Sequence, residues 1–394
     1  STINIRYEYH SIVFDAGSTG TRIHIFVFEL LTQDPLKLGL KSENFLEVKP
    51  GLNEYFDEPE KAAESMRPLL QFALQVVPEN IRKETGLQFL ATAGLRLLKP
   101  EQTDAILKSV TKLLSEYPFN VTSISILDGD SEGINAWMTI NFLKDSLHLQ
   151  EGSFGVVDLG GGSTQVTFKV LEENRSLYPK EKIADIHIGC KTETLYTRSY
   201  LGYGFRSSRK SILLTDKDVD ENEKTIKLSH PCIPLGRIAN WTFEGVNYTI
   251  TGENGDCFDV IRSFVIKKDD NGQKFVEAPQ YLDRQPIYAI SHYYDHALTY
   301  GLLNGDEAVL TVDAYYVRAK AICEEMFATN TNYTSRRESL SNEQKENFLR
   351  TYPFACLDLT YVTLLLNQGL GLKLNKTITA AKKIDGKEAS WALG

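Results

Sequence analysis

The sequence predicts a protein of the α/β class, built as two lobes with a ligand cleft between them. Three observations carry this prediction. Short β-rich runs alternate with helical stretches, a glycine-rich segment occurs twice, and 394 residues are too many for one ordinary core. We expect a first lobe over residues 1–150 and a second over 151–379, with the segment from about 380 to 394 returning to the first lobe.

The predicted elements alternate along the first half of the chain. Apolar and β-branched runs predict strands at 11–14, 23–28, 87–91, 122–127, 154–157 and 166–170, and amphipathic stretches predict helices at 59–76, 100–117 and 131–147. The segment from about 205 to 285 is rich in Asn, Gly and Asp, which indicates an irregular insertion in the second lobe. From Tyr288 onward the helical and strand patterns resume.

An internal repeat is the most informative feature. The segment DAGSTGTR at residues 15–22 reappears 143 positions later as DLGGGSTQ at residues 158–165. Each copy lies between two predicted strands, so each is a hairpin loop and matches neither the P-loop nor the dinucleotide fingerprint. The repeat length matches one lobe, so we expect the two loops to face each other across the cleft.

Both loops have the composition of a phosphate site. Backbone N–H groups in a tight glycine turn supply converging donors for phosphate oxygens, and hydroxyl side chains add more. The predicted phosphate-binding residues are Ser18, Thr19, Gly20 and Thr21 in the first loop and Gly160, Gly161, Gly162, Ser163 and Thr164 in the second. Two ordinary hairpin turns are the alternative, and the duplication weighs against it.

An aspartate leads each loop at a strand end. Asp15 and Asp158 therefore point toward the predicted cleft. Carboxylate oxygens suit Mg²⁺ or Ca²⁺, often through water when phosphates share the coordination sphere. The alternative for either residue alone is an ordinary turn-forming aspartate.

Two further segments carry candidate catalytic groups. In LDGDSEG, Glu132 lies in the first turn of a predicted helix, where it could deprotonate a water; helix N-terminal stabilisation is the alternative. In LATAGLR, Thr92 could hold a metal-bound water and Arg96 could pair with a carboxylate or phosphate.

Charge, hydropathy and cysteine content narrow the class of protein. The net charge of -9 argues against a nucleic-acid groove, and no apolar run approaches the roughly 20 residues of a membrane helix. Four of the five cysteines could form two local disulfides, Cys232–Cys257 and Cys323–Cys356, leaving Cys190 free; five reduced thiols in a cytosolic enzyme are the alternative. Glycosylation sequons occur at Asn120, Asn174, Asn240, Asn247, Asn332 and Asn375. Together these features favour an oxidising compartment.

Taken in order, DAGSTGTR, ATAGLR, DGDSEG and DLGGGSTQ resemble the first four signatures of the apyrase family, the nucleoside triphosphate diphosphohydrolases. SWALG at residues 390–394 resembles the fifth. The stretches at 196–204, 293–295 and 356–361 are similar to the soluble nucleoside diphosphatase branch. Members of that branch reside in the endoplasmic reticulum or are secreted, and they prefer UDP, GDP and IDP.

The resemblance implies two actin-like lobes of the ribonuclease-H type around a nucleotide cleft. It also implies an enzyme that uses Ca²⁺ or Mg²⁺ and an activated water to hydrolyse the terminal phosphate of nucleoside diphosphates, and triphosphates less well. The implied catalytic residues are Glu132 as base with Gln165, Ser163 and Thr92, and Asp15 and Asp158 would hold the metal through waters. Tyr361 matches an aromatic beside the nucleobase, although a packed core tyrosine fits equally. The disulfides match the branch, and the family continues beyond Gly394 into a further helix.

Other functions remain open from sequence. A broad apyrase would act on ATP and ADP, a kinase of the same superfamily would need an acceptor pocket, and an actin- or chaperone-like protein would bind nucleotide to change conformation. We expect a monomer with a nucleotide substrate, no nucleic acid and no membrane span, located in the endoplasmic reticulum lumen or secreted.

Overall fold

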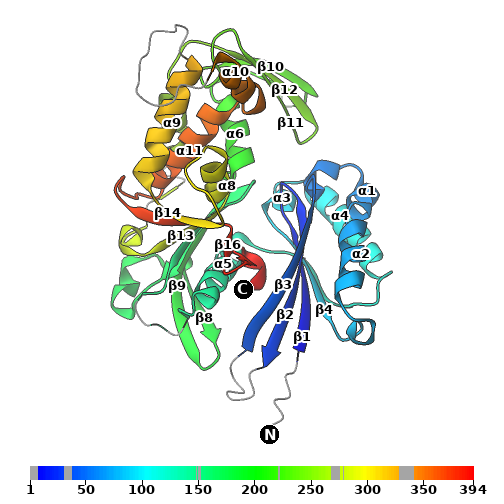
Figure 1. The fold of residues 1–394 in the computed structure, drawn as a ribbon. Helices are drawn as coiled ribbons and strands as arrows, with labels where there is room; N and C mark the ends of the chain where they lie inside the picture. Colours follow the sequence, from blue (N-terminus) through cyan, green and yellow to red (C-terminus); the bar gives the residue numbers. More distant parts are fainter. Residues whose placement is uncertain are drawn as a thin grey trace. The chain divides into compact units, whose positions relative to one another are not determined.

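The computed structural model describes residues 8–30, 38–147, 149, 152–220, 222–267, 276–277, 279–327 and 341–394. The chain forms two compact units, one comprising Ser1–Gly204 with Ala381–Gly394 and the other Phe205–Ala380. The first unit contains both copies of the repeat, and Figure 1 shows its elements in blue to green, with those of residues 381–394 in red. The predicted lobe boundary at residue 150 was derived from the position of the repeat, whereas the compact units divide after Gly204. The boundary between the lobes therefore stays a prediction.

The first unit is built from a five-stranded sheet, four strands of a seven-stranded sheet, a two-stranded sheet and the helices that cover them. Its elements are β1 (Glu8–Ala16), β2 (Thr21–Leu30), β3 (Leu38–Val48), η1 (Leu52–Tyr55), α1 (Pro59–Glu64), α2 (Arg67–Val76), η2 (Glu79–Ile81), β4 (Gly86–Ala91), α3 (Ala93–Arg96), α4 (Pro100–Leu114), β5 (Asn120–Ile126), α5 (Gly129–Leu143), β6 (Gly155–Leu159), β7 (Ser163–Lys169), η3 (Glu172–Leu177), η4 (Lys180–Lys182), β8 (Ile183–Ile188), β9 (Lys191–Leu201), β16 (Lys383–Ile384), β17 (Lys387–Glu388) and η7 (Trp391–Leu393).

The second unit contains the helices and strands between Phe205 and Ala380. Its elements are α6 (Phe205–Leu214), β10 (Thr225–His230), β11 (Ile238–Phe243), β12 (Val246–Gly252), α7 (Cys257–Val265), η5 (Leu282–Arg284), β13 (Ile287–Ser291), α8 (His292–Thr299), β14 (Glu307–Thr311), α9 (Val312–Phe327), α10 (Asn342–Thr351), α11 (Ala355–Leu364), η6 (Leu365–Gly369) and β15 (Thr377–Ala381).

The first sheet has the strand order β3-β2-β1-β4-β5, with β4 parallel to β1 and the β1–β2–β3 strands antiparallel. Side chains alternate between its two faces. Ile12, Phe14 and Ala16 of β1 belong to the buried core, so Asp15 points to the opposite face. The period of the strand thus directs the first aspartate away from the helices and toward the second copy of the repeat.

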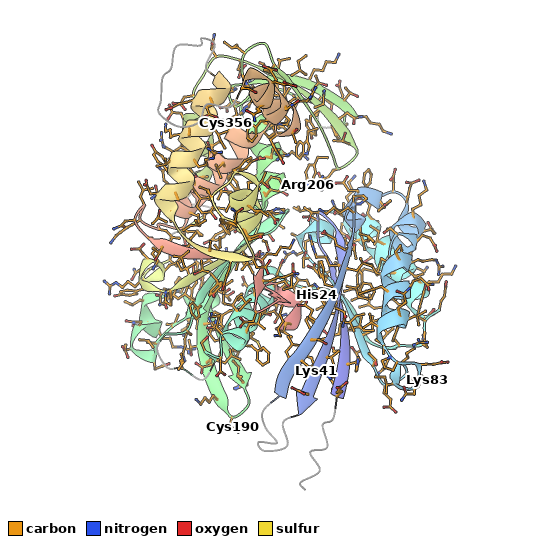
Figure 2. The ribbon with its side chains drawn as sticks, in the orientation of Figure 1. His24, Lys41, Lys83, Cys190, Arg206 and Cys356 are labelled. Carbon is orange, nitrogen blue, oxygen red and sulfur yellow. A yellow bond between two sulfur atoms is a disulfide. The ribbon has the colours of Figure 1, made fainter. Side chains whose placement is uncertain are left out.

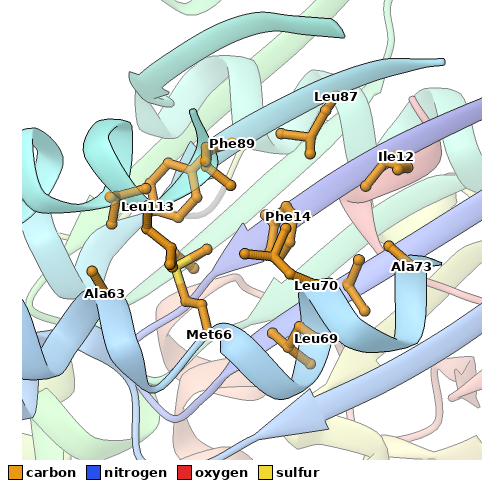
Figure 3. Packing of buried hydrophobic residues seen from close by; sticks show 14 of the residues in the cluster. Ile12, Phe14, Ala63, Met66, Leu69, Leu70, Ala73, Leu87, Phe89 and Leu113 are labelled. Atoms are coloured by element: carbon orange, nitrogen blue, oxygen red, sulfur yellow. The ribbon is translucent and has the colours of Figure 1, made fainter. Parts of the chain in front are cut away.

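The core of this sheet lies under α1, α2 and α4 (Figure 1). In Figure 3, Phe14 and Phe89 from the strands pack beside Met66 and Leu70 from the helical side. All four side chains are completely buried, and burial of such side chains supplies about 1.5–3 kcal/mol each. This packing makes the sheet a rigid support for the loop that follows β1.

The second sheet of this unit repeats the arrangement of the first. Within this unit, four strands of the seven-stranded sheet follow the order β6-β7-β9-β8 with antiparallel pairing, as β1, β2 and β3 do. Asp15 is opposite Arg22 in the first hairpin and Asp158 is opposite Gln165 in the second. Helix α5 packs on β6, β7 and β9, and η7 at the chain end contacts α5 and β1.

The structure differs from the sequence-based expectations in three places. The helix expected at 59–76 is two helices, because Pro68 lacks an N–H and its ring would collide with the carbonyl of Glu64 in a continuous helix. Strand β3 was not predicted, since Gly39, Lys41 and Asn44 are poor strand formers and only pairing with β2 makes it regular. The segment expected to be irregular forms α6, the sheet β10-β12-β11 and α7.

Both predicted disulfides, Cys232–Cys257 and Cys323–Cys356, are present in the second unit. Cys190 is a free, exposed thiol at the turn between β8 and β9 (Figure 2). Among the helices of the described residues, none is long and apolar enough to cross a membrane.

The sequon asparagines lie mostly at the surface. Those at 120, 240, 247 and 375 are exposed, Asn174 is half-buried, and Asn332 lies outside the described residues.

Candidate active site

The two glycine loops share one backbone geometry. In the first, Gly17 N–H donates to Gly20 O at 3.0 Å; in the second, Gly160 N–H donates to Ser163 O at 3.0 Å. These bonds occupy the same position after the leading aspartate. The sequence repeat is therefore also a repeat of hairpin structure.

The two loops also lie against each other within the first unit. A methyl group added at Gly161 would overlap Ser18 Oγ, and one at Gly162 would lie 2.8 Å from Ala93 Cβ. On the other side, a methyl group at Gly94 would lie 2.8 Å from Ser18 Cα. Glycine is required at these positions because the backbones approach too closely for a side chain.

The leading aspartates are both buried, Asp15 at 5% exposure and Asp158 at 4%. Arg22 Nη1 lies 3.5 Å from Asp15 Oδ2, while Asp15 Oδ1 is buried without a hydrogen-bond partner among the described residues. Burial raises the pKa of Asp15, and the Arg22 guanidinium opposes this rise. An unsatisfied buried carboxylate oxygen is the kind of donor that a hard cation or its bound water uses.

No three Asp, Glu, His or Cys side chains converge as direct metal ligands in the part of the chain that the structure describes. The two aspartates could hold a cation only with waters or substrate oxygens completing its coordination. That arrangement agrees with how Mg²⁺ is usually bound beside phosphates, through one or two carboxylates.

Glu132 lies in the first turn of α5, which Asp128 caps by accepting from the backbone N–H groups of Asp130 and Ser131 at 3.1 and 2.9 Å. Its carboxylate is 5% exposed, and Arg96 Nη2 donates to Oε2 at 2.8 Å. Burial raises the pKa of Glu132 to about 8; the Arg96 guanidinium opposes this, and the carboxylates of Asp158 and Asp15 add to it. Because the charges of Asp15 and Asp158 act on Glu132, the three predicted carboxylates lie in one site.

Ser163 and Gln165 complete the network around Glu132. Arg96 Nη2 donates to Ser163 Oγ at 3.1 Å, and Gln165 Nε2 donates to the same oxygen at 2.8 Å. Gln165 Nε2 also approaches Glu132 Oε2 at 3.4 Å. Because the Ser163 oxygen accepts from both neighbours, its own hydrogen is available for a ligand.

The remaining loop residues differ in their access to the site. Thr92 is buried at the start of α3, and its N–H donates to Ala16 O at 3.1 Å. Thr164 Oγ1 donates to Asp158 O at 2.8 Å, and Arg22 Nη2 donates to Thr19 Oγ1 at 3.1 Å. Thr21 is completely buried in β2. The hydroxyls of Thr164 and Thr19 therefore brace their loops, and the phosphate role of Thr21 stays a prediction.

Tyr361 belongs to the second unit, on α11. It is 1% exposed, and its ring lies 6.1 Å from that of Phe264. The structure thus describes a packed core side chain, and its predicted role beside a nucleobase stays a prediction.

Sequence reasoning did not single out Ser199, which belongs to this network. Its Oγ accepts from Gln165 Nε2 at 2.9 Å, and its N–H donates to Asp130 Oδ1 at 3.0 Å. Ser199 lies in the stretch at 196–204, which is similar to the soluble nucleoside diphosphatase branch but predicts no function for this serine. Only the pairing of β7 with β9 brings it to the site.

Comparisons with known proteins agree with this geometry. The model of the GDA1/CD39 (nucleoside phosphatase) family matches residues 3–394. The chain is 37% identical to ectonucleoside triphosphate diphosphohydrolase 5 of Gallus gallus, covering 98% of this chain and 86% of that protein. It is 34% identical to the human nucleoside diphosphate phosphatase ENTPD5 and 36% identical to ectonucleoside triphosphate diphosphohydrolase 6 of Mus musculus, covering 98% of this chain and 86% and 80% of those proteins.

Among solved structures, the nucleoside triphosphate hydrolases of Neospora caninum match with a TM-score of 0.62 at 14% identity, covering 98% of this chain and 91% of that chain. This likeness concerns the fold alone, and it confirms the predicted α/β, actin-like class. The predicted resemblance to the apyrases is likewise confirmed by the sequence relatives. The chain belongs to the GDA1/CD39 family of nucleoside phosphatases.

Proposed function

We propose that the protein hydrolyses the terminal phosphate of nucleoside diphosphates, with Glu132 as the base that activates the attacking water. The observation that carries the proposal is the position of this buried carboxylate, bonded to Arg96 and electrostatically coupled to both loop aspartates. A base that is buried from bulk solvent and hydrogen-bonded to one charged donor is suited to orient a single water for in-line attack.

The glycine loops supply the second part of the proposal. Their backbone N–H groups and the free hydrogen of Ser163 would bind the oxygens of the terminal phosphate. Gln165 would hold the water on the Glu132 side, because its amide already bridges Ser163 and Glu132. These hydrogen-bond donors would thus stabilise the negative charge that develops on the phosphate without having to rearrange.

We further propose that Asp15 and Asp158 hold Ca²⁺ or Mg²⁺ through waters. When bound, such a cation would neutralise phosphate charge and polarise the bond to be broken. The unsatisfied Oδ1 of Asp15 supports this assignment. The two aspartates would fix the waters, and Thr92, buried next to β1, would add a hydroxyl to that shell.

The cellular location belongs to the same proposal. Disulfides such as Cys232–Cys257 and Cys323–Cys356 persist in oxidising compartments. We place the enzyme in the endoplasmic reticulum lumen or outside the cell, acting as a monomer on free nucleotide.

A phosphate-release assay tests the proposed reaction. UDP, GDP, IDP, ADP and ATP are each supplied with Mg²⁺, with Ca²⁺, or with EDTA and no metal. We expect release from UDP, GDP and IDP with metal, slower release from the triphosphate, and none with EDTA. Equal rates on ATP and ADP would indicate a broad apyrase, and turnover well below one per second on all five would indicate a nucleotide-gated binding protein.

A further inference from the structure

Helix α5, which carries Glu132, packs closely against strands β7 and β9. A methyl group added at Gly129 would overlap the Ser199 side chain, and one at Gly133 would lie 2.5 Å from Thr167 Oγ1. These glycines flank Glu132 on either side along the helix. Strands β7 and β9 therefore form the surface against which the turn carrying Glu132 is seated.

Polar contacts from β9 hold that turn. Ser199 N–H donates to Asp130 Oδ1 at 3.0 Å, and Thr197 Oγ1 donates to Asp130 O at 3.3 Å. The first of these bonds comes from the backbone of Ser199. The side chain of Ser199 is not used in this bond, and its Oγ accepts from Gln165 Nε2 instead.

The amide of Gln165 has two hydrogens and three acceptors within reach. Its Nε2 lies 2.8 Å from Ser163 Oγ, 2.9 Å from Ser199 Oγ and 3.4 Å from Glu132 Oε2. Gln165 Oε1 is buried without a partner among the described residues, so it does not fix the orientation of the amide. The hydroxyl of Ser199 is thus a second short contact, beside that of Ser163, that holds Nε2 next to Glu132.

We propose that Ser199 is a positioning residue for the hydrolysis, acting through Gln165 to hold the amide in line with Ser163 and Glu132. The inference rests on the proposed function, and it adds a residue from β9 to that site. Ser199 touches no reacting atom in this account. Its effect should therefore appear in kcat, while the affinity for nucleotide stays the same.

A double-mutant cycle tests this proposal. Phosphate release from UDP with Mg²⁺ is measured for the wild type, Ser199→Ala, Gln165→Ala and the double variant. We expect Ser199→Ala to lower kcat about tenfold, the scale of one hydrogen bond, with KM within twofold. In the Gln165→Ala background the same change should alter kcat less than twofold, because the contact through which Ser199 acts is already gone.

A control from the same strand separates positioning from strand stability. Thr194 Oγ1 donates to Asp185 Oδ1 at 2.7 Å and accepts from Arg175 Nη1, away from Glu132 and Gln165, so Thr194→Ala should leave kcat within twofold. Ser199→Cys replaces the hydroxyl with a somewhat larger thiol that is a weak acceptor, and it should give a smaller loss of kcat than Ser199→Ala. If Ser199→Ala does not fold, the cycle is run with Ser199→Cys and an expected loss of about threefold.

Two results would overturn the proposal. One is a kcat for Ser199→Ala within twofold of the wild type. The other is a tenfold loss that persists in the Gln165→Ala background. Both leave the proposed function standing, whereas a wild-type protein that releases no phosphate from any nucleotide overturns that function and this inference together.

Discussion

Two arginine–carboxylate pairs, Arg209–Asp358 in the second unit and Arg96–Glu132 in the first, are built differently. In the second unit, Arg209 donates to Asp358 through Nε at 3.0 Å and Nη2 at 2.5 Å. In the first unit, Arg96 donates to Glu132 through one nitrogen, which it shares with Ser163. Arg96 Nε is buried without a hydrogen-bond partner among the described residues.

The surroundings of Arg209 also supply more contacts than those of Arg96. The guanidinium of Arg209 lies 4.6 Å from the ring of Phe205, 4.6 Å from that of Phe354 and 5.2 Å from that of Trp241. Charge, hydrogen bonding and aromatic faces are all satisfied, so this pair joins α6, α11 and β11. The pair around Glu132 keeps unused bonding capacity. A fully satisfied pair holds structure together, and an incompletely satisfied one is available to a ligand.

The largest expected effect falls on the satisfied pair. Asp358→Asn leaves Arg209 buried with its charge uncompensated, and we expect the free energy of unfolding to fall by about 3–5 kcal/mol. Urea denaturation checks this value. Because the variant keeps the volume of the side chain, a change below about 1 kcal/mol would mean that the aromatic faces alone sustain Arg209.

The matching change in the first unit should act on activity. Arg96→Met removes the charged donor from Glu132 and Ser163 while keeping an unbranched side chain. Loss of a charge-assisted bond costs about 1.5–3 kcal/mol, so kcat/KM for UDP at pH 7 should fall about 10- to 100-fold. An unchanged kcat/KM, with a folded variant by circular dichroism, would show that Arg96 only fills space.

The pH dependence of the wild type sharpens the assignment of the base. Burial raises the pKa of Glu132 to about 8, and a base acts only when deprotonated, so kcat/KM should fall by up to tenfold per pH unit below its midpoint. A divalent cation held by Asp15 and Asp158 would lower that midpoint toward the ordinary value of 4.5. The profile in Arg96→Met should move to higher pH. A profile that stays flat from about one pH unit below the ordinary value of 4.5 up to pH 9 would exclude a titrating base.

The smallest expected effect concerns stability near Glu132. The pKa is higher in the folded state than in the unfolded state, so the folded protein binds the proton more tightly between pH 4.5 and about 8. Stability from this group is therefore lost as pH rises through that window. Glu132→Gln removes the titration, and in EDTA its Tm should exceed that of the wild type by a few degrees at pH 8 and match it at pH 4.5. A lower Tm at pH 8 would mean that the charged form is stabilising.

The loops and their strands were predictable because their signals are local. A strand, an aspartate and a glycine turn recur in order at residues 15–22 and 158–165, and the period of two directs each aspartate to one face. The same local reasoning missed the break between α1 and α2, although Pro68 marks it in the sequence. Strand β3 could not be found locally because pairing with β2 overrides its weak propensity.

Contacts between distant residues were beyond reach for a different reason. Arg209 and Asp358 are separated by 149 positions, and Gln165 and Ser199 by 34. A lone serine on a strand carries no pattern that distinguishes it from a surface residue. Its part in the site follows only from the register that pairs β7 with β9.

The central claim is that Glu132 activates the attacking water, and Glu132→Gln tests it most directly. The variant keeps the shape of the side chain and its contact with Arg96 but cannot accept the proton. We expect phosphate release from UDP with Mg²⁺ to fall about 10³-fold, while calorimetry shows UDP binding within about threefold of the wild type. Release within tenfold of the wild type would contradict the account.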